Sequence, residues 1–202
     1  MSVTDAFTAL VETSTGTAVR CRYHEPWRHY HDWSHPLAMI VHLVAAERDG
    51  IQIHDSTAAA AFVLWHDAIY DPQAAAGRNE ELSAALCRND LSAPAISVER
   101  AVAAILATAD HKVPDAGKCP DGALLLDVDL AILGAEADDF DRYDAQIAAE
   151  YAHVEPAAYR AGRAGVLRRF LNRGRLYVTD WARVRWEARA RDNLARAIAR
   201  LG

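Results

Sequence analysis

Histidine and aspartate residues at three places in the chain have the spacing that a metal site requires. His31 and His35 are four residues apart, so a helical turn would place both imidazoles on one face. His66 and Asp67 are adjacent at the end of an apolar run, 61–65. Ionisable groups in such apolar surroundings need partners, because burying an unpaired charge is unfavourable. A metal ion is one partner that would serve all of them together.

Asp127 and Asp129 form the third group, inside the leucine-rich segment 124–133. Positions i and i+2 on a helix are about 200° apart, so the two carboxylates cannot be equivalent ligands. Asp129 is the predicted ligand, because it shares a helical stripe with leucines that we expect to face the core; Asp127 is the alternative. Imidazole and carboxylate ligands suit Mn, Fe, Co, Ni or Zn, and with more waters Mg.

Each motif alone has an ordinary structural explanation, but their order along the chain is specific. The order His35, His66-Asp67, Asp129 resembles the HD superfamily of metal-dependent phosphohydrolases, and more narrowly its small bacterial branch of predicted phosphohydrolases. The resemblance runs from about residue 20 to the end of the chain. The segments that carry it are Arg28–His35, His66–Asp71, Asn79–Ser83, Ala107–His111, Asp127–Gly134 and Tyr159–Arg163.

This resemblance implies a helical fold around one divalent metal ion (Mn, Mg, Co, Ni, Fe or Zn) held by His35, His66, Asp67 and Asp129. It also implies hydrolysis of a phosphate ester or anhydride, with a nucleotide or another small phosphorylated metabolite as substrate. Distant HD relatives that cleave cyclic nucleotides have a His-Asn-x-x-His segment whose first histidine protonates the leaving group. By that analogy His31 is the general acid, although Asp32 stands where that pattern has Asn.

Further residues are predicted to complete the chemistry. A divalent metal polarises a phosphoryl oxygen and lowers the pKa of a bound water, and Asp67 can both ligate the metal and orient that water. Phosphate prefers the bidentate geometry of arginine, and the candidates are Arg28, Arg78 and Arg163. His111 is predicted as a substrate contact or a cation at a helix end, with a second metal as the less favoured role.

Three alternative functions compete with hydrolysis. His31 and His35 also fit the H-x-x-x-H spacing of zinc peptidases, but those need Glu after the first histidine, where this chain has Asp32. A di-iron oxygenase needs additional ligands, and only His111 is in reserve. A nucleotide-sensing HD module without turnover would keep the site and lose the reaction.

The apolar spacing is helical almost throughout and predicts one all-α domain over residues 1–202. Its basic helices, from about residue 156, are predicted to wrap the core. Thr4 is predicted to cap the first helix, and the helix of 36–48 is predicted to turn Leu37, Ile40, Val41 and Val44 inward. The remaining predicted helices cover about 55–67, 79–89, 97–111, 122–133, 137–153, 156–172 and 180–201.

Composition narrows the class of protein. The chain is 51% hydrophobic and 25% charged, as in soluble globular proteins, and no apolar run reaches the roughly 18 residues of a membrane span. The N-terminus has no visible signal peptide, and three distant cysteines favour a reducing cytoplasm. Residues 156–202 hold twelve Arg against three acids, yet no nucleic-acid motif is present. We expect no membrane or nucleic-acid polymer as a partner, and leave a homodimer open.

Overall fold

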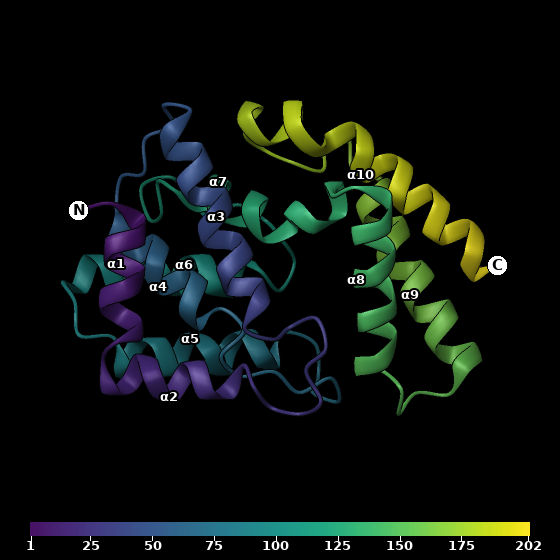
Figure 1. Ribbon diagram of the computed structural model, residues 1–202, viewed down its shortest axis with the longest axis horizontal. Coiled ribbons are helices and arrows are strands. Elements are labelled where there is room, and N and C mark those ends of the chain that lie inside the picture. Colours follow the sequence, from purple (N-terminus) through teal and green to yellow (C-terminus); the bar gives the residue numbers. More distant parts are fainter. The chain divides into compact units, whose positions relative to one another are not determined.

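The computed structural model describes all 202 residues and contains helices and connecting segments without any strand (Figure 1). This confirms the predicted all-α class. None of the helices combines the length and apolar character needed to cross a membrane. The helices are α1 (Val3–Val11), α2 (Ser14–Arg22), α3 (Ser34–Arg48), α4 (Ser56–Trp65), α5 (Arg78–Asp90), α6 (Ala95–Ala107), α7 (Gly122–Asp129), the 3₁₀ helix η1 (Leu130–Gly134), α8 (Ala137–Glu150), α9 (Pro156–Leu171) and α10 (Asp180–Leu201).

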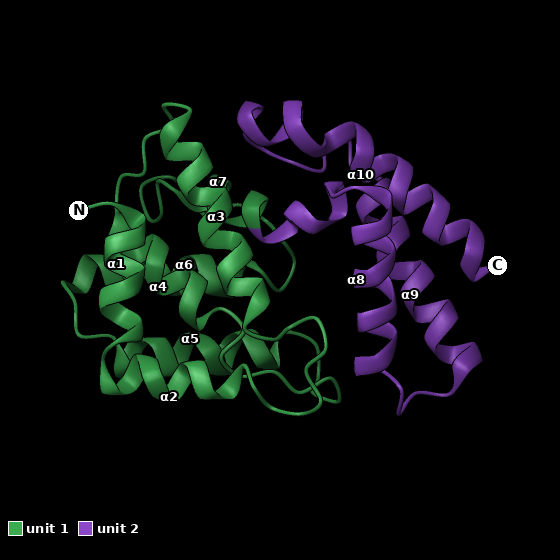
Figure 2. Ribbon diagram, in the orientation of Figure 1, with its two compact units in different colours: residues 1–128 green, residues 129–202 purple.

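The chain divides into two compact units, residues 1–128 and 129–202 (Figure 2). The boundary falls at the end of α7, well before the basic segment that was predicted to begin near residue 156. The first unit contains α1 to α7, and the second contains η1 and α8 to α10. The assignment of residues 1–202 to one domain therefore stays a prediction.

Helix α4 is the centre of the first unit. Every residue from Ala58 to Trp65 is buried, and the helix contacts α1, α2, α3, α5 and α6. A helix that is apolar on all sides is stable only inside a core, and the run of alanines lets its neighbours approach closely. Asp55 starts the helix by accepting a hydrogen bond from the Ala58 amide (2.9 Å). The buried helix carries His66 at its C-terminal end.

Asp121 fixes the start of the same helix from a distant part of the chain. Its carboxylate accepts hydrogen bonds from the His54 and Asp55 amides, each at 2.9 Å, and contacts His54 Nδ1 at 2.9 Å. Asp121 itself is buried and directly precedes α7. This carboxylate therefore joins the start of α7 to the start of the helix that ends in His66.

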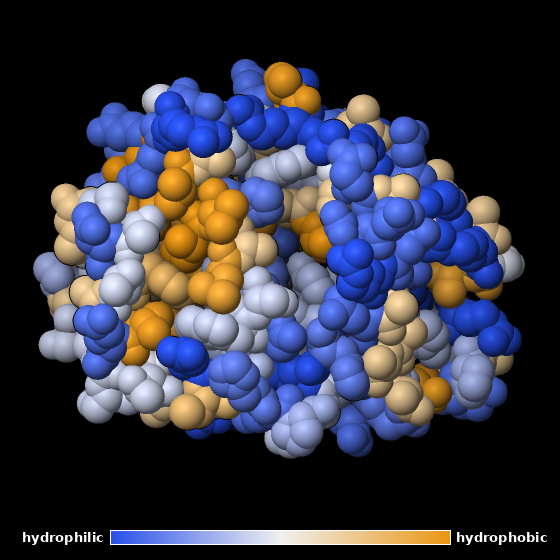
Figure 3. Space-filling model, viewed as in Figure 1, coloured by the Kyte–Doolittle hydropathy of each residue, from blue (hydrophilic) through white to orange (hydrophobic).

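Helix α3 buries a different face from the one predicted. Ile40 is buried as expected, but Leu37, Val41 and Val44 are 44%, 64% and 40% exposed. They form an apolar patch on the surface over α3 (Figure 3). The buried side chains are His35, Pro36, Met39, Ile40, Leu43 and Ala46. His35 therefore lies on the side of α3 that faces the core.

The N-terminal helices also differ from the prediction. Ser2, not Thr4, caps α1, in a reciprocal pair of hydrogen bonds with Asp5. Helix α2 was not predicted, and it begins at the cap residue Thr13. A Cβ on Gly16 would lie 1.9 Å from the Leu10 carbonyl oxygen, so only glycine permits this close approach of α2 to the end of α1.

The helices predicted over 97–111 and 122–133 end early, as does the helix predicted over 137–153, which ends at Glu150. The helix expected to reach His111 ends at Ala107, and His111 lies beyond it with a positive φ of 53°. The helix expected over 122–133 is α-helical only to Asp129 and continues as the 3₁₀ turn η1. The change of helix type occurs at the predicted fourth ligand.

In the second unit the arginines of α10, together with Arg163 of α9, are paired with acids and carbonyls of the same unit. Arg196 and Arg200 both contact Asp141 at 2.9 Å, and Arg191 contacts Glu187 at 2.7 Å. Asn193 donates to the carbonyls of Leu133 and Ala135, which ties α10 to the end of η1. A large part of the basic composition of this segment is therefore used in internal ion pairs.

Candidate metal centre

His66 turns its Nε2 toward the other candidate ligand atoms. Its Nδ1 lies 3.1 Å from the Val63 carbonyl oxygen, one turn back in α4. A carbonyl can only accept, so Nδ1 carries the proton in the neutral ring and Nε2 keeps its lone pair. The imidazole is 2% exposed. The end of α4 thus fixes both the tautomer and the direction of His66.

His35 faces His66 from the first turn of α3. The two Nε2 atoms are 3.1 Å apart, and His35 Nδ1 lies 3.2 Å from the Tyr30 hydroxyl. A hydrogen-bonding partner on the second ring nitrogen is the usual companion of a metal-binding histidine, because it holds the ring orientation. Tyr30 was not singled out by the sequence.

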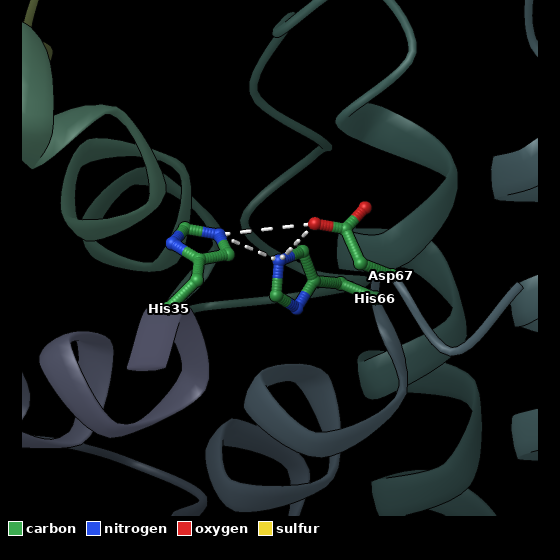
Figure 4. Close-up of side chains that lie close together, drawn as sticks. All are labelled: His35, His66 and Asp67. Carbon is green, nitrogen blue, oxygen red and sulfur yellow. Dashed lines mark hydrogen bonds and ion pairs between the residues drawn. The ribbon is translucent and has the colours of Figure 1, made fainter. Parts of the chain in front are cut away.

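Asp67 completes a group of three ligand atoms (Figure 4). Its Oδ2 lies 3.0 Å from His66 Nε2 and 3.8 Å from His35 Nε2. All three atoms lie within 4.8 Å of one another. Ligands placed about 2.0–2.2 Å from one ion are about 2.8–3.6 Å apart at octahedral (90°) or tetrahedral angles. Two of the three separations match this spacing, and the third is a few tenths of an ångström longer.

The chemistry of these three atoms fits a cation. With His66 neutral, its Nε2 lone pair and the Asp67 carboxylate oxygen face each other at 3.0 Å, an arrangement that is repulsive unless positive charge lies between them. Two nitrogen donors and one oxygen donor suit the divalent transition metals. The residues present therefore fit the predicted ion at three of its four ligands.

The electrostatics of Asp67 agree with a site that attracts positive charge. Burial alone would raise the pKa of the Asp67 carboxyl, but His66 in its protonated form, by its charge and its hydrogen bond, together with charged His31 and His35, holds this pKa well below the usual range. The carboxylate is ionised at neutral pH and is available as an anionic ligand.

His31 lies beside this group rather than within it. It precedes α3, so it does not share a helical turn with His35 as predicted, yet the two ring centroids are 6.2 Å apart. The His31 ring stacks on Tyr70 at 4.2 Å between centroids. The structure therefore brings His31 close to three predicted ligands, and its role as the general acid stays a prediction.

Asp129 was expected to face the core and Asp127 to face away from it, but the structure buries Asp127 more deeply. Asp127 is only 1% exposed, whereas Asp129, the last residue of α7, is partly exposed. The leucines that were expected to mark the core side, Leu125 and Leu126, are buried along with Asp127. Asp129 is the first residue of the second unit and is not one of the three clustered ligands. Its role as fourth ligand stays a prediction.

The prediction that Arg28 contacts phosphate is corrected by the structure. Its side chain has no exposed surface, and its nitrogens donate to Glu25 and to three backbone carbonyls. It has no face to offer to a substrate.

The other predicted substrate contacts lie outside the group. Arg78, at the start of α5, forms an exposed ion pair with Glu81 at 3.1 Å. Arg163 belongs to the second unit, where it is buried, pairs with Asp144 at 3.0 Å and stacks over Tyr143. His111 lies in the turn after α6. None of these three residues belongs to the clustered ligands, and their role in binding substrate stays a prediction.

The segment after Asp67 is fixed by side chains whose role sequence reasoning missed. Ser83 on α5 accepts from the Ile69 amide at 3.0 Å and is fully buried. Asn79 both accepts from the Asp71 amide and donates to its carbonyl, at 3.1 and 3.0 Å. Both residues lie in 79–83, a segment that the HD resemblance includes. The motif resemblance therefore included these two residues without indicating what they do. In the structure they hold the backbone that follows the candidate metal ligand Asp67.

Comparisons of the chain with protein-family models, with curated proteins and with solved structures gave no match. The fold and the site define an all-helical protein with a largely buried His–His–Asp group that could hold a metal ion. The HD resemblance accounts for that group and remains a hypothesis based on the motifs.

Proposed function

We propose that this chain is a metal-dependent phosphohydrolase that cleaves a phosphate ester or anhydride of a nucleotide or another small phosphorylated metabolite. The observation that carries the proposal is the convergence of His35 Nε2, His66 Nε2 and Asp67 Oδ2 within 4.8 Å of one another. A fourth ionisable side chain, His31, lies beside them. The order of these residues along the chain, which resembles that of HD phosphohydrolases, supports it independently.

His35, His66 and Asp67 would hold one divalent ion (Mn, Mg, Co, Ni, Fe or Zn), with Asp129 as the proposed fourth ligand. When bound, such an ion supplies a Lewis acid for the phosphoryl group and makes water a stronger nucleophile near neutral pH. The protein's contribution is to keep the three donors close together. Val63 and Tyr30 do so by fixing the two imidazole rings.

Two side chains would handle protons in the reaction. The free oxygen of Asp67 would accept a hydrogen bond from the attacking water and so orient it. His31, protonated before the reaction, would give its proton to the departing oxygen as the phosphorus–oxygen bond breaks, a step worth roughly 10²–10⁴-fold in rate. The stack on Tyr70 would keep the His31 ring in one orientation through both events.

The proposed location is the cytoplasm. Cys87 and Cys119 are buried free thiols, which suits a reducing compartment. No partner other than the small substrate is proposed.

The decisive experiment combines metal analysis with an activity screen. The purified protein would be assayed on nucleotides and sugar phosphates with Mn, Mg, Co and Ni, and compared with His66→Ala and with the exposed control His24→Ala. The proposal expects about one divalent ion per chain, phosphate release that needs the metal, and loss of both only in His66→Ala.

Other outcomes point to other functions. Two irons per chain with oxygen uptake would replace hydrolysis with an oxygenase reaction. Tight nucleotide binding without phosphate release would indicate a sensing module. Absence of any bound metal would remove the basis of the proposal.

A further inference from the structure

Arg28 joins the two segments of the chain that carry the candidate chemistry. Its Nη1 donates to the carbonyl oxygens of His31 (3.1 Å) and Asp67 (2.8 Å), and its Nη2 donates to Ala68 (3.2 Å). His31 and Asp67 are far apart in the sequence and belong to different elements. One guanidinium group therefore sets the distance between the backbone of the candidate acid and the backbone of a candidate metal ligand.

The same side chain also acts on the His31 ring through an aromatic neighbour. The Arg28 guanidinium carbon lies 5.1 Å from the Tyr23 ring centroid and 5.5 Å from that of Tyr70. Tyr70 in turn stacks on the His31 imidazole at 4.2 Å. Arg28 thus contacts His31 twice, once at its carbonyl and once through the ring that supports its imidazole.

Because the Arg28 side chain is buried, a different residue at this position would have to satisfy the same hydrogen-bonding partners without help from water. The Arg28 side chain has no exposed surface, and its charge is compensated by Glu25 at 2.9 Å, three carbonyls and two aromatic rings. A planar fork of donors can reach several carbonyls at once, whereas the lysine ammonium is a compact point charge without that geometry. The site is therefore built for arginine in particular.

We propose that Arg28 is a positioning residue that sets the place of His31 relative to the group His35, His66 and Asp67. It touches neither substrate nor metal. This inference rests on the proposed function for its effect on turnover, but the placement of His31 next to the metal can be measured without any reaction.

The experiment uses Co²⁺-loaded full-length protein and two readouts. Paramagnetic shifts of the His31 ring protons report their distance from the bound Co²⁺, and steady-state kinetics separate kcat from KM. The variant is Arg28→Lys. The matched control is Arg88→Lys, an exposed arginine that pairs with Glu99 at 3.0 Å on the surface.

We expect Arg28→Lys to keep one Co²⁺ per chain, to shift the His31 ring signals, and to lose kcat by about 10²-fold with a much smaller change in KM, because small misplacements of a reacting group are costly. The control should match the wild type in all three measurements. Unchanged His31 signals and unchanged kcat in Arg28→Lys would overturn the proposal.

A second variant covers the case in which Arg28→Lys fails to fold. Tyr70→Leu leaves the Arg28 hydrogen bonds in place and removes the ring that both Arg28 and His31 contact, so the His31 signals should move in the same experiment; unmoved signals would count against the positioning role. If the wild type hydrolyses no phosphate ester, the proposed function fails, and the His31 shifts alone then decide whether Arg28 positions His31.

Discussion

The Nε2 atoms of His35 and His66 face each other at 3.1 Å in the interior of the first unit, with Asp67 Oδ2 3.0 Å from the second of them. His66 cannot relieve this contact by exchanging its tautomer, because its Nδ1 proton is held by the Val63 carbonyl. His35 can donate from its Nε2 to His66 when its Nδ1 accepts from the Tyr30 hydroxyl. The contact between His66 Nε2 and Asp67 Oδ2, both acceptors, instead needs a proton on His66 or a cation between the two atoms. This relationship links the buried end of α4 to the chemistry and leads to the first prediction.

Removal of metal should destabilise the protein. A ligand that binds only the folded state adds about 2.7 kcal/mol when present at 100 times its dissociation constant. We therefore expect chelation to lower the melting temperature of the wild type and to have little effect on His66→Ala, which should already lack metal. Scanning calorimetry with and without chelator measures both. Equal melting temperatures of the wild type in both conditions would contradict a metal bound at this group.

His31 and His35 should respond differently to the same substitution. His35→Ala removes a ligand and should lose metal and activity together. His31→Ala should keep the metal and lose about 10²–10⁴-fold in kcat, as expected for a missing general acid. Metal analysis alongside kinetics separates the two. If His31→Ala loses metal as readily as His35→Ala, then His31 is a ligand and the acid must be sought elsewhere.

Acid should lower the stability of the protein by protonating Asp55, which caps α4 and binds Ser97 and Arg100 of α6. Burial raises the pKa of this carboxyl, but hydrogen bonds from the Ala58 amide, Arg100 and Ser97 outweigh it and hold the pKa below the ordinary value of 3.8. A lowered folded-state pKa gives stability that is fully present above pH 3.8 and is lost as pH falls through the folded value.

Asp55→Asn should therefore be less stable than the wild type at pH 7, and the difference should shrink as pH falls below 3.8. Urea unfolding at several pH values tests this. A constant difference across that range would show that the charge of Asp55 contributes nothing. Asp138, an exposed acid in the first turn of α8, offers Asp138→Asn as the control.

Substitutions on α3 should follow the observed face rather than the predicted one. Leu43 is fully buried, so Leu43→Ala should cost about 2–5 kcal/mol of unfolding free energy. Val41 is 64% exposed, and Val41→Ala should change stability by less than about 0.5 kcal/mol. Chemical denaturation measures both. Similar losses in the two variants would mean that the exposed patch is covered in solution.

The two stripes of α3 show why sequence alone could not orient this helix. Leu37, Val41 and Val44 form one apolar stripe, and Met39, Ile40 and Leu43 form another. A helix with apolar residues on both sides has no amphipathic signal, so only the packing partners decide which side is buried. By contrast, the start of α4 was predictable because Asp55 is a strong cap directly before a continuous apolar run.

The candidate site was predictable where residue type alone carries the chemistry. The clustering of His35, His66 and Asp67 was predicted from the need of ionisable groups in apolar segments for partners and from the order of the motifs, which resembles that of HD phosphohydrolases. The role of Arg28 could not be found in this way, since its partners are backbone carbonyls that only the fold brings together. Helix α2 was not predicted because its first half, rich in Ser, Thr and Gly, has the composition of a loop. The cap residue Thr13 that starts the helix was not recognised in the sequence.

Asp127 and Asp129 provide the last prediction, because burial and the expected ligand role point to different residues. Asp127 is almost fully buried, so its removal should affect stability first. Asp129 is partly exposed, as is the ligand Asp67, so burial does not exclude it as a ligand. The isosteric changes Asp127→Asn and Asp129→Asn remove the charge from each side chain without creating a cavity, which separates charge from packing.

We expect Asp129→Asn to reduce bound metal and phosphate release to background. After treatment with chelator, this variant and the wild type should have the same melting temperature. Asp127→Asn should keep its metal and should melt at a lower temperature with or without chelator, because a buried carboxylate would lose its partners. Metal analysis and melting curves on both variants decide between them. The reverse pattern would exchange the roles of the two residues, and metal retained in both would leave the fourth ligand to another residue, with His111 as the first to test.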